Sequence, residues 1–170
     1  MNGASAEDCA NTMMTPNNSN MAIKGSSHHF FRVLRNPQIN YYIGLTYEAL
    51  GKKADAKSYF SKSKDQSLRE VNYIVYYQGL SFLKLGDKDK AAELFNILIK
   101  EGEKKMSGDS DIDFFAKFGE REAENVKLSN AYLLKGLGYK GLGDAKSATE
   151  NLSKSVELSA SNLFAKVELK

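Results

Sequence analysis

A pattern of residues that recurs at an offset of 35 positions constrains this chain more than any other feature. Two glycines, an alanine and a phenylalanine keep the same spacing in two consecutive segments, as the pairs Gly44/Gly79, Gly51/Gly86, Ala56/Ala91 and Phe60/Phe95. The same offset pairs two further large apolar positions, Tyr47 with Phe82 and Leu50 with Leu85. Six matches at one offset are hard to obtain by chance, so we infer an internal repeat.

A third copy of the pattern lies further along the chain. The internal spacing returns in Gly136, Tyr139, Leu142, Gly143, Ala148 and Leu152. Gly136 follows Gly79 by 57 positions rather than 35. A segment of about 22 residues is therefore inserted between the second and third copies, by the same count of positions.

Each copy predicts two helices joined by a short turn. In the first copy, one helical face from about residue 37 to residue 50 is apolar, with Ile39, Ile43, Tyr47 and Leu50. Asn36 suits the N-cap and Pro37 the first turn, while Gly51 suits the left-handed residue after the helix. A second helix is expected from about residue 53 to residue 65.

Glycine also stands inside the leading helix of every copy, at Gly44, Gly79 and Gly136. Such a glycine costs about 1 kcal/mol relative to alanine. A cost repeated at equivalent positions indicates a steric requirement. We expect the second helix to approach closely there with its small residue, Ala56, Ala91 or Ala148. Phe60 and Phe95 are then expected to fill the space between adjacent hairpins.

This pattern resembles the tetratricopeptide repeat (TPR) from residue 37 to about residue 155, apart from the insertion. The family's small residue at position eight, aromatic at eleven and alanine at twenty are matched in all three copies. Its aromatic at twenty-four is matched by Phe60 and Phe95, whereas the third copy has Leu152. The family's early tryptophan and late proline are missing, replaced by Asn40, Val75 and Tyr132 and by Leu68, Glu103 and Ala160.

A narrower resemblance concerns four phrases, "NYYIGLTYEALGKKADAKSYF", "YYQGLSFLKLGDKDKAAELFNILIKEGEK", "DIDFFA" and "LLKGLGYKGLGDAKSATENL". They look like the C-terminal TPR region of large bacterial multidomain proteins with β-rich, glycosidase-like domains upstream. This resemblance implies a structural helical tail of a larger carbohydrate-active protein, without the upstream enzyme residues.

The predicted fold is all-α, a TPR-like helical-repeat solenoid of three helix-turn-helix hairpins. The hairpins are expected at about residues 37–68, 71–101 and 128–158, with a helical insertion at about 102–127 and a C-terminal capping helix in 159–170. The helical domain then spans 30–170, and the Asn-rich residues 1–29 are expected to be a disordered tail. The cap is expected to start near Ser161 or Asn162 and to cover the open end of the solenoid with apolar side chains.

The insertion has two possible structures. Residues 102–108 predict a loop, after which Asp109 and Asp111 cap a short helix that begins near Ile112. The alternative is a single long helix leading into the third hairpin, and we favour the short extra helix because Gly119 would interrupt a long one. The spacing D-x-D-x-D also suggests calcium, but Phe114 stands where the loop needs glycine, so no metal is expected.

No catalytic set is visible in the sequence. The two histidines, His28 and His29, lie in the tail, as does the lone Cys9. The stretch 136–141 has the outline G-x-G-x-x-G but follows no strand, so it is not read as a dinucleotide site. We therefore expect a non-catalytic protein with no cofactor.

Charge and hydropathy argue against two classes of partner, nucleic acid and membrane. The net charge of +3 is too balanced to favour nucleic acid, and no apolar run reaches the length of a membrane span. No signal peptide is visible, which indicates a cytoplasmic protein if the chain is free-standing.

The resemblance implies protein–protein interaction or scaffolding through the concave face of the leading helices. The expected groove positions are Tyr41, Leu45, Glu48, Tyr73, Tyr76, Leu80, Leu83, Lys84, Asn130, Leu133, Leu137 and Lys140. Tyrosine is favoured at interfaces because it combines a large rigid ring with a polar tip. Self-association is a further alternative, and an insertion folded across the groove would remove the binding face.

Overall fold

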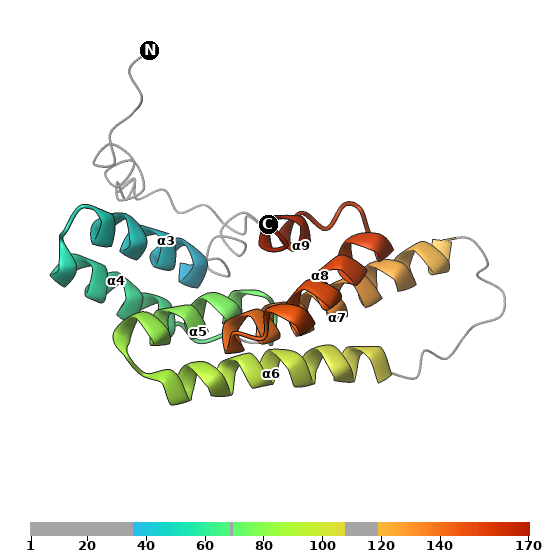
Figure 1. Ribbon diagram of the computed structural model, residues 1–170, viewed down its shortest axis with the longest axis horizontal. Coiled ribbons are helices and arrows are strands. Elements are labelled where there is room, and N and C mark those ends of the chain that lie inside the picture. Colours follow the sequence, from blue (N-terminus) through green and yellow to red (C-terminus); the bar gives the residue numbers. More distant parts are fainter. Residues whose placement is uncertain (1–35, 69, 108–118) are drawn as a thin grey trace, which may run out of the picture.

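The computed structural model describes residues 36–68, 70–107 and 119–170, with side chains of the last range from residue 124 onward. Within these residues the chain is helical and contains no strand. Three hairpins follow one another: α3 (Asn36–Ala49) with α4 (Lys53–Lys64), α5 (Ile74–Leu85) with α6 (Lys88–Ser107), and α7 (Gly119–Leu142) with α8 (Ala145–Leu158). A short helix, α9 (Leu163–Glu168), ends the chain (Figure 1). The prediction of an all-α solenoid of three hairpins is confirmed. The predicted tail 1–29 lies outside the described residues.

Glycine ends each leading helix, as the repeat pattern predicts. Gly51, Gly86 and Gly143 have φ angles of 74°, 90° and 85°, in the left-handed region that glycine adopts without steric cost. After Gly86, for example, the amide of Asp87 donates to the carbonyl oxygen of Phe82 at 3.0 Å. This closure lets the second helix begin within two or three residues, which fixes the hairpin.

The glycine inside each leading helix lies under a large side chain of its own hairpin. A Cβ atom added to Gly44 would lie 2.5 Å from Cε1 of Phe60, and one added to Gly136 would lie 2.7 Å from Cγ of Leu152. Gly79 meets Phe95 in the same way. The expectation that alanine is the residue closest to these glycines is therefore wrong. The expectation that the phenylalanine fills the space between adjacent hairpins holds for Phe95, which also lies against Gly141 of α7.

Much of the insertion continues the helices on either side of it. The predicted loop at 102–108 is wrong for its described part, since α6 runs on to Ser107. Helix α7 begins at Gly119 and runs without a break into the third hairpin, as both alternatives require over 120–127. The predicted short helix near Ile112 and the aspartates before it lie outside the described residues.

Glycines also let α6 and α7 approach closely. A Cβ on Gly102 would lie 2.7 Å from the carbonyl oxygen of Ala131, and one on Gly138 would lie 2.6 Å from the carbonyl oxygen of Phe95. Backbone atoms cannot yield as a flexible side chain can. These two glycines therefore hold the second and third hairpins together along most of α6.

In the first hairpin, and again in the third, a buried serine of the second helix forms a hydrogen bond with the leading helix. Ser63 donates to the carbonyl oxygen of Pro37 at 2.8 Å, and the equivalent Ser155 donates to the carbonyl oxygen of Ser129 at 2.7 Å. Ser63, Ser129 and Ser155 are fully buried. Because buried polar groups are costly when unpaired, these bonds fix where the second helix returns to the first.

Candidate functional site on the concave face

The candidate site is the face formed by the leading helices α3, α5 and α7, in which α5 contacts both of the others. Figure 1 shows α9 on one side of α5 and α6 on the other. The face that carries the predicted groove positions is therefore the α9 side, and α6 belongs to the outer layer.

The structure divides the predicted groove residues by burial. Tyr76 and Leu133 are only 5% and 4% exposed and belong to the core. Tyr41, Tyr73 and Leu80 are half-buried and pack against that core. These aromatic and aliphatic side chains form the floor of the face, so most of their area already serves packing within the chain.

The charged residues of the face are paired. Lys84 Nζ lies 2.5 Å from Glu48 Oε2, which links the first two hairpins across the rim. Both side chains remain partly exposed, at 35% and 46%, so this ion pair adds little to stability. Lys140 donates to Glu168 of α9, at 2.8 Å to its carboxylate and 2.6 Å to its carbonyl oxygen.

Helix α9 lies on this face. The ring of Phe164 packs on the ring of Tyr73 with centroids 4.1 Å apart. Asn162, just before α9, donates to Asn130 Oδ1 at 3.4 Å. Together with Lys140, three predicted groove residues therefore contact the C-terminal segment.

The contact between α9 and the concave face was missed by the sequence analysis. The start of the helix agrees with expectation, because the Asn162 side chain accepts a hydrogen bond from the amide of Ala165. The available signal was the spacing of Phe164 and Glu168, which puts an aromatic ring and a carboxylate on one side of a helix.

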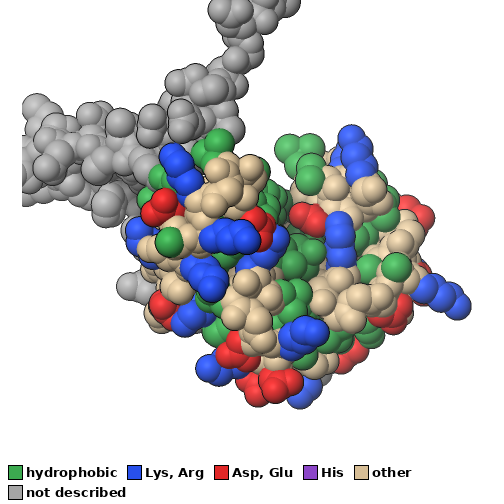
Figure 2. Space-filling view, turned by 60° about the vertical axis from the view of Figure 1, so that its left-hand side comes forward, with side chains coloured by type: hydrophobic (Ala, Val, Ile, Leu, Met, Phe, Trp, Pro, Cys, Tyr) green, Lys and Arg blue, Asp and Glu red, His purple; other side chains and the backbone are tan. Residues whose placement is uncertain are grey.

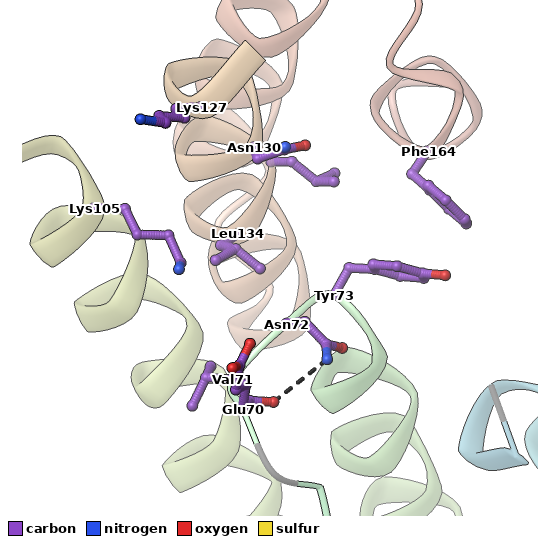
Figure 3. Close-up of a pocket in the computed structure, with 10 residues that line it drawn as sticks. Glu70, Val71, Asn72, Tyr73, Lys105, Lys127, Asn130, Leu134 and Phe164 are labelled. Atoms are coloured by element: carbon purple, nitrogen blue, oxygen red, sulfur yellow. Dashed lines mark hydrogen bonds between the residues drawn. The ribbon is translucent and has the colours of Figure 1, made fainter. Parts of the chain in front are cut away.

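A pocket of about 590 Å³ opens where α9 meets the segment that leads into α5, the middle of α7 and the C-terminal end of α6. Figure 3 shows Phe164 over Tyr73 on one side, with Lys105 and Lys127 across from them. The pocket is lined by Glu70, Val71, Asn72, Tyr73, Lys105, Lys127, Asn130, Leu133, Leu134 and Phe164. Its walls thus combine apolar side chains with two ammonium groups and one carboxylate.

The tyrosines of the face have raised pKa values. Burial first, and then the carboxylate of Glu168, raises the pKa of Tyr76 far above its ordinary value. Burial is also the largest cause for Tyr41 and Tyr77, whose pKa values are raised as well. Their phenols therefore stay neutral at physiological pH and act as hydrogen-bonding groups, as when Gln38 donates to Tyr77 Oη at 3.0 Å.

Metal binding and membrane insertion were also considered from the sequence. In the described ranges, no group of three or more histidine, cysteine, aspartate or glutamate side chains is arranged to hold a metal ion. His28, His29, Asp109, Asp111 and Asp113 lie outside those ranges. None of the described helices combines the length and the apolar character needed to cross a membrane.

Part of the concave face is left uncovered. Figure 2 shows a hollow floored by hydrophobic side chains between two raised parts of the surface, with lysines and acidic residues around it. Leu83, a groove position on α5, is 40% exposed. Leu45 on α3 and Leu80 on α5 are half-buried.

Comparison with protein families matches tetratricopeptide repeat models to residues 39–66 and 73–101 and to residues 129–162. No curated protein and no solved structure is significantly similar to the chain. The three matched segments are the three hairpins, and together they cover more than half of the sequence. The chain therefore belongs to the tetratricopeptide repeat family, whose repeats typically build non-catalytic modules for protein interaction or scaffolding.

Proposed function

We propose that this chain binds a partner polypeptide through its concave face. The observation that carries the proposal is the exposure of Leu83, a large apolar side chain of a leading helix that is 40% open to solvent. Half-buried Leu45 and Leu80 extend the apolar surface at neighbouring groove positions. The ion pair between Lys84 and Glu48 supplies a polar rim.

This combination is typical of a protein interface rather than of a catalytic site. Interfaces have an apolar centre and a polar rim, and their binding energy is concentrated in a few central side chains. Tyr76 and Leu133 are too buried to contact a partner directly, so they are proposed to support the face from below. Leu45, Leu80 and Leu83 are proposed as the contacting residues.

The test replaces one exposed leucine and compares it with a matched position on the outer layer. Leu83→Glu introduces a charge on the concave face, and Ile97→Glu does so on α6. The two side chains are 40% and 41% exposed, so both substitutions should leave the fold intact. A partner recovered with the unaltered chain is purified, and its affinity for each variant is measured by calorimetry.

We expect Leu83→Glu to weaken binding by at least about tenfold, because a charge would be buried unpaired at the interface, whereas Ile97→Glu keeps the affinity. Circular dichroism establishes that both variants are folded. A folded Leu83→Glu variant with unchanged affinity, or a loss confined to Ile97→Glu, would show that the concave face is not the binding surface.

Self-association is a second candidate, favoured by the outer side of α9. Leu163 and Val167 are 68% and 64% exposed and lie one helical turn apart. A second copy could cover this apolar pair at the end of the solenoid. Sedimentation over a range of concentrations tests it, and a monomer throughout removes it.

A further inference from the structure

Helix α9 meets the concave face through one side only. Phe164, Ala165 and Glu168 turn toward the rest of the chain, and Ala165 is fully buried. Leu163 and Val167 face solvent, although both are large apolar side chains. The contact is therefore selective: an aromatic ring and a carboxylate, four positions apart, are the groups that the face takes up.

Each of these two groups has a specific counterpart on the leading helices. The ring of Phe164 lies on Tyr73 of the segment that enters α5. The carboxylate of Glu168 is 2.8 Å from Lys140 Nζ of α7 and is only 14% exposed. Tyr73 and Lys140 thus form a two-point recognition site for a helix of suitable length.

The pocket beside Phe164 has room for a further side chain. Its volume of about 590 Å³ remains with Phe164 already in place as one wall. Volumes of about 300–1,000 Å³ are usual for ligand sites. Lys105, whose Nζ lies 3.2 Å from Glu101 Oε1, and Lys127 line it opposite the aromatic pair, and Glu70 is its one acidic lining residue. The pocket therefore offers room for a partner side chain beside Phe164 without a marked excess of either charge.

We propose that this surface is a receptor for a short amphipathic helix of a partner, with an aromatic residue followed four positions later by an acidic residue. Helix α9 is the occupant that the chain itself provides. The partner's aromatic side chain takes the place of Phe164 against Tyr73, and its carboxylate takes the place of Glu168 against Lys140. The inference rests on the proposed function, since it names the partner chemistry of the concave face.

Occupation by α9 sets the conditions under which a partner binds. A short tether gives an attached segment an effective concentration on the order of millimolar. A partner must therefore bind the face more tightly than α9 does, or bind after α9 is released. Loosening α9 should raise the affinity for a helix of the same chemistry.

The experiment uses the full chain and a fluorescent peptide that spans residues 159–170. Phe164→Ala in the chain removes the aromatic contact of α9 and leaves Tyr73 and Lys140 in place. Leu163→Ala is the matched control, because it removes a large apolar side chain from the exposed side of the same helix. Peptide binding is measured by fluorescence anisotropy.

We expect the Phe164→Ala chain to bind the peptide at least about tenfold more tightly than the unaltered or Leu163→Ala chain, because the weakened α9 competes less for the face. Replacing the peptide's phenylalanine by alanine should abolish this binding. A folded Phe164→Ala chain that does not bind the peptide, or a Leu163→Ala chain that binds it equally well, overturns the proposal.

A charge reversal tests the second contact. Lys140→Glu in the Phe164→Ala chain should abolish peptide binding, and Glu168→Lys in the peptide should restore it. Absence of rescue overturns the assignment of the carboxylate to Lys140. If Leu83→Glu disrupts partner binding while the peptide never binds, the proposed function stands and this inference fails. If the peptide binds but Leu83→Glu leaves partner binding unchanged, the contacts of α9 with Tyr73 and Lys140 are confirmed, but the proposed function fails and the inference about a partner fails with it.

Discussion

A single pair of residues, glycine and the large side chain 16 positions later, explains the local geometry of each hairpin. Gly79 has no Cβ, so the ring of Phe95 lies directly against the backbone of α5. Phe95 is 1% exposed and therefore has no free space to move into. The glycine is thus required by the ring, and its cost in helix propensity is offset by dense packing.

This geometry reverses the usual effect of a glycine-to-alanine substitution. In an open helix the change stabilises by about 0.4–1 kcal/mol, whereas Gly79→Ala forces a methyl group into the ring of Phe95. We expect Gly79→Ala to lower the free energy of unfolding by about 1–3 kcal/mol, measured by urea denaturation. The cost should fall by at least half in a Phe95→Ala background, because alanine has no atoms beyond Cβ to meet the added methyl group. A stabilised Gly79→Ala variant would contradict the packing.

The repeat pattern predicted these glycines but not their neighbours. Periodicity shows which face of a helix is buried and which positions are equivalent. It does not show which of two inward side chains, Ala91 or Phe95, lies above Gly79. That choice depends on the rotation of α6 about its own axis, which is set by packing with α5 and α7 together.

At the scale of elements, the insertion shows why glycine was misread as a helix end. Gly102 lies inside α6 against the carbonyl oxygen of Ala131, where any side chain would collide with backbone. Local propensity favours a loop there, but the close contact with α7 outweighs it. The surface that receives α9 was missed for a similar reason, since the spacing of Phe164 and Glu168 indicates which side of the helix is buried but not which element it packs against.

Asn162 fixes the start of α9 and joins it to the third hairpin. Its side chain accepts from the amide of Ala165 at 3.3 Å and donates to the hydroxyls of Ser129 and Ser155 at 3.0 and 3.1 Å. Loss of an N-cap costs about 1 kcal/mol, and loss of partners for buried hydroxyls adds to it.

We therefore expect Asn162→Ala to reduce amide protection over 163–168 in hydrogen exchange and to lower the melting temperature by a few degrees. Ser161→Ala is the control, because Ser161 is exposed and its hydroxyl contacts only Ser159 among the described residues. Equal protection of α9 in the two variants would mean that the cap and the serine bonds do not hold the helix.

At the scale of the whole molecule, the three hairpins are not equally coupled. The hydrophobic core cluster takes its buried members from α5, α6, α7, α8 and α9, and α3 meets it at the edge, through the rings of Tyr41 and Tyr42 against Tyr77. The close contact between α6 and α7 accounts for this, because the long helices bring the second and third hairpins into one unit. Phe60 is as buried as Phe95 but lies outside the cluster.

Two matched substitutions test this unequal coupling. Phe60→Leu and Phe95→Leu remove the same atoms from equivalent, fully buried positions, and each should cost on the order of 1 kcal/mol. In a solenoid, the effect spreads only through contacts between neighbouring repeats. We expect Phe60→Leu to increase hydrogen exchange mainly in α3 and α4, and Phe95→Leu to increase it from α5 through α8, because its ring also lies against Gly141 of α7. Native-state hydrogen exchange at several low denaturant concentrations resolves the two patterns. Identical increases along the whole chain in both variants would show a single cooperative unit, in which the first hairpin unfolds with the rest.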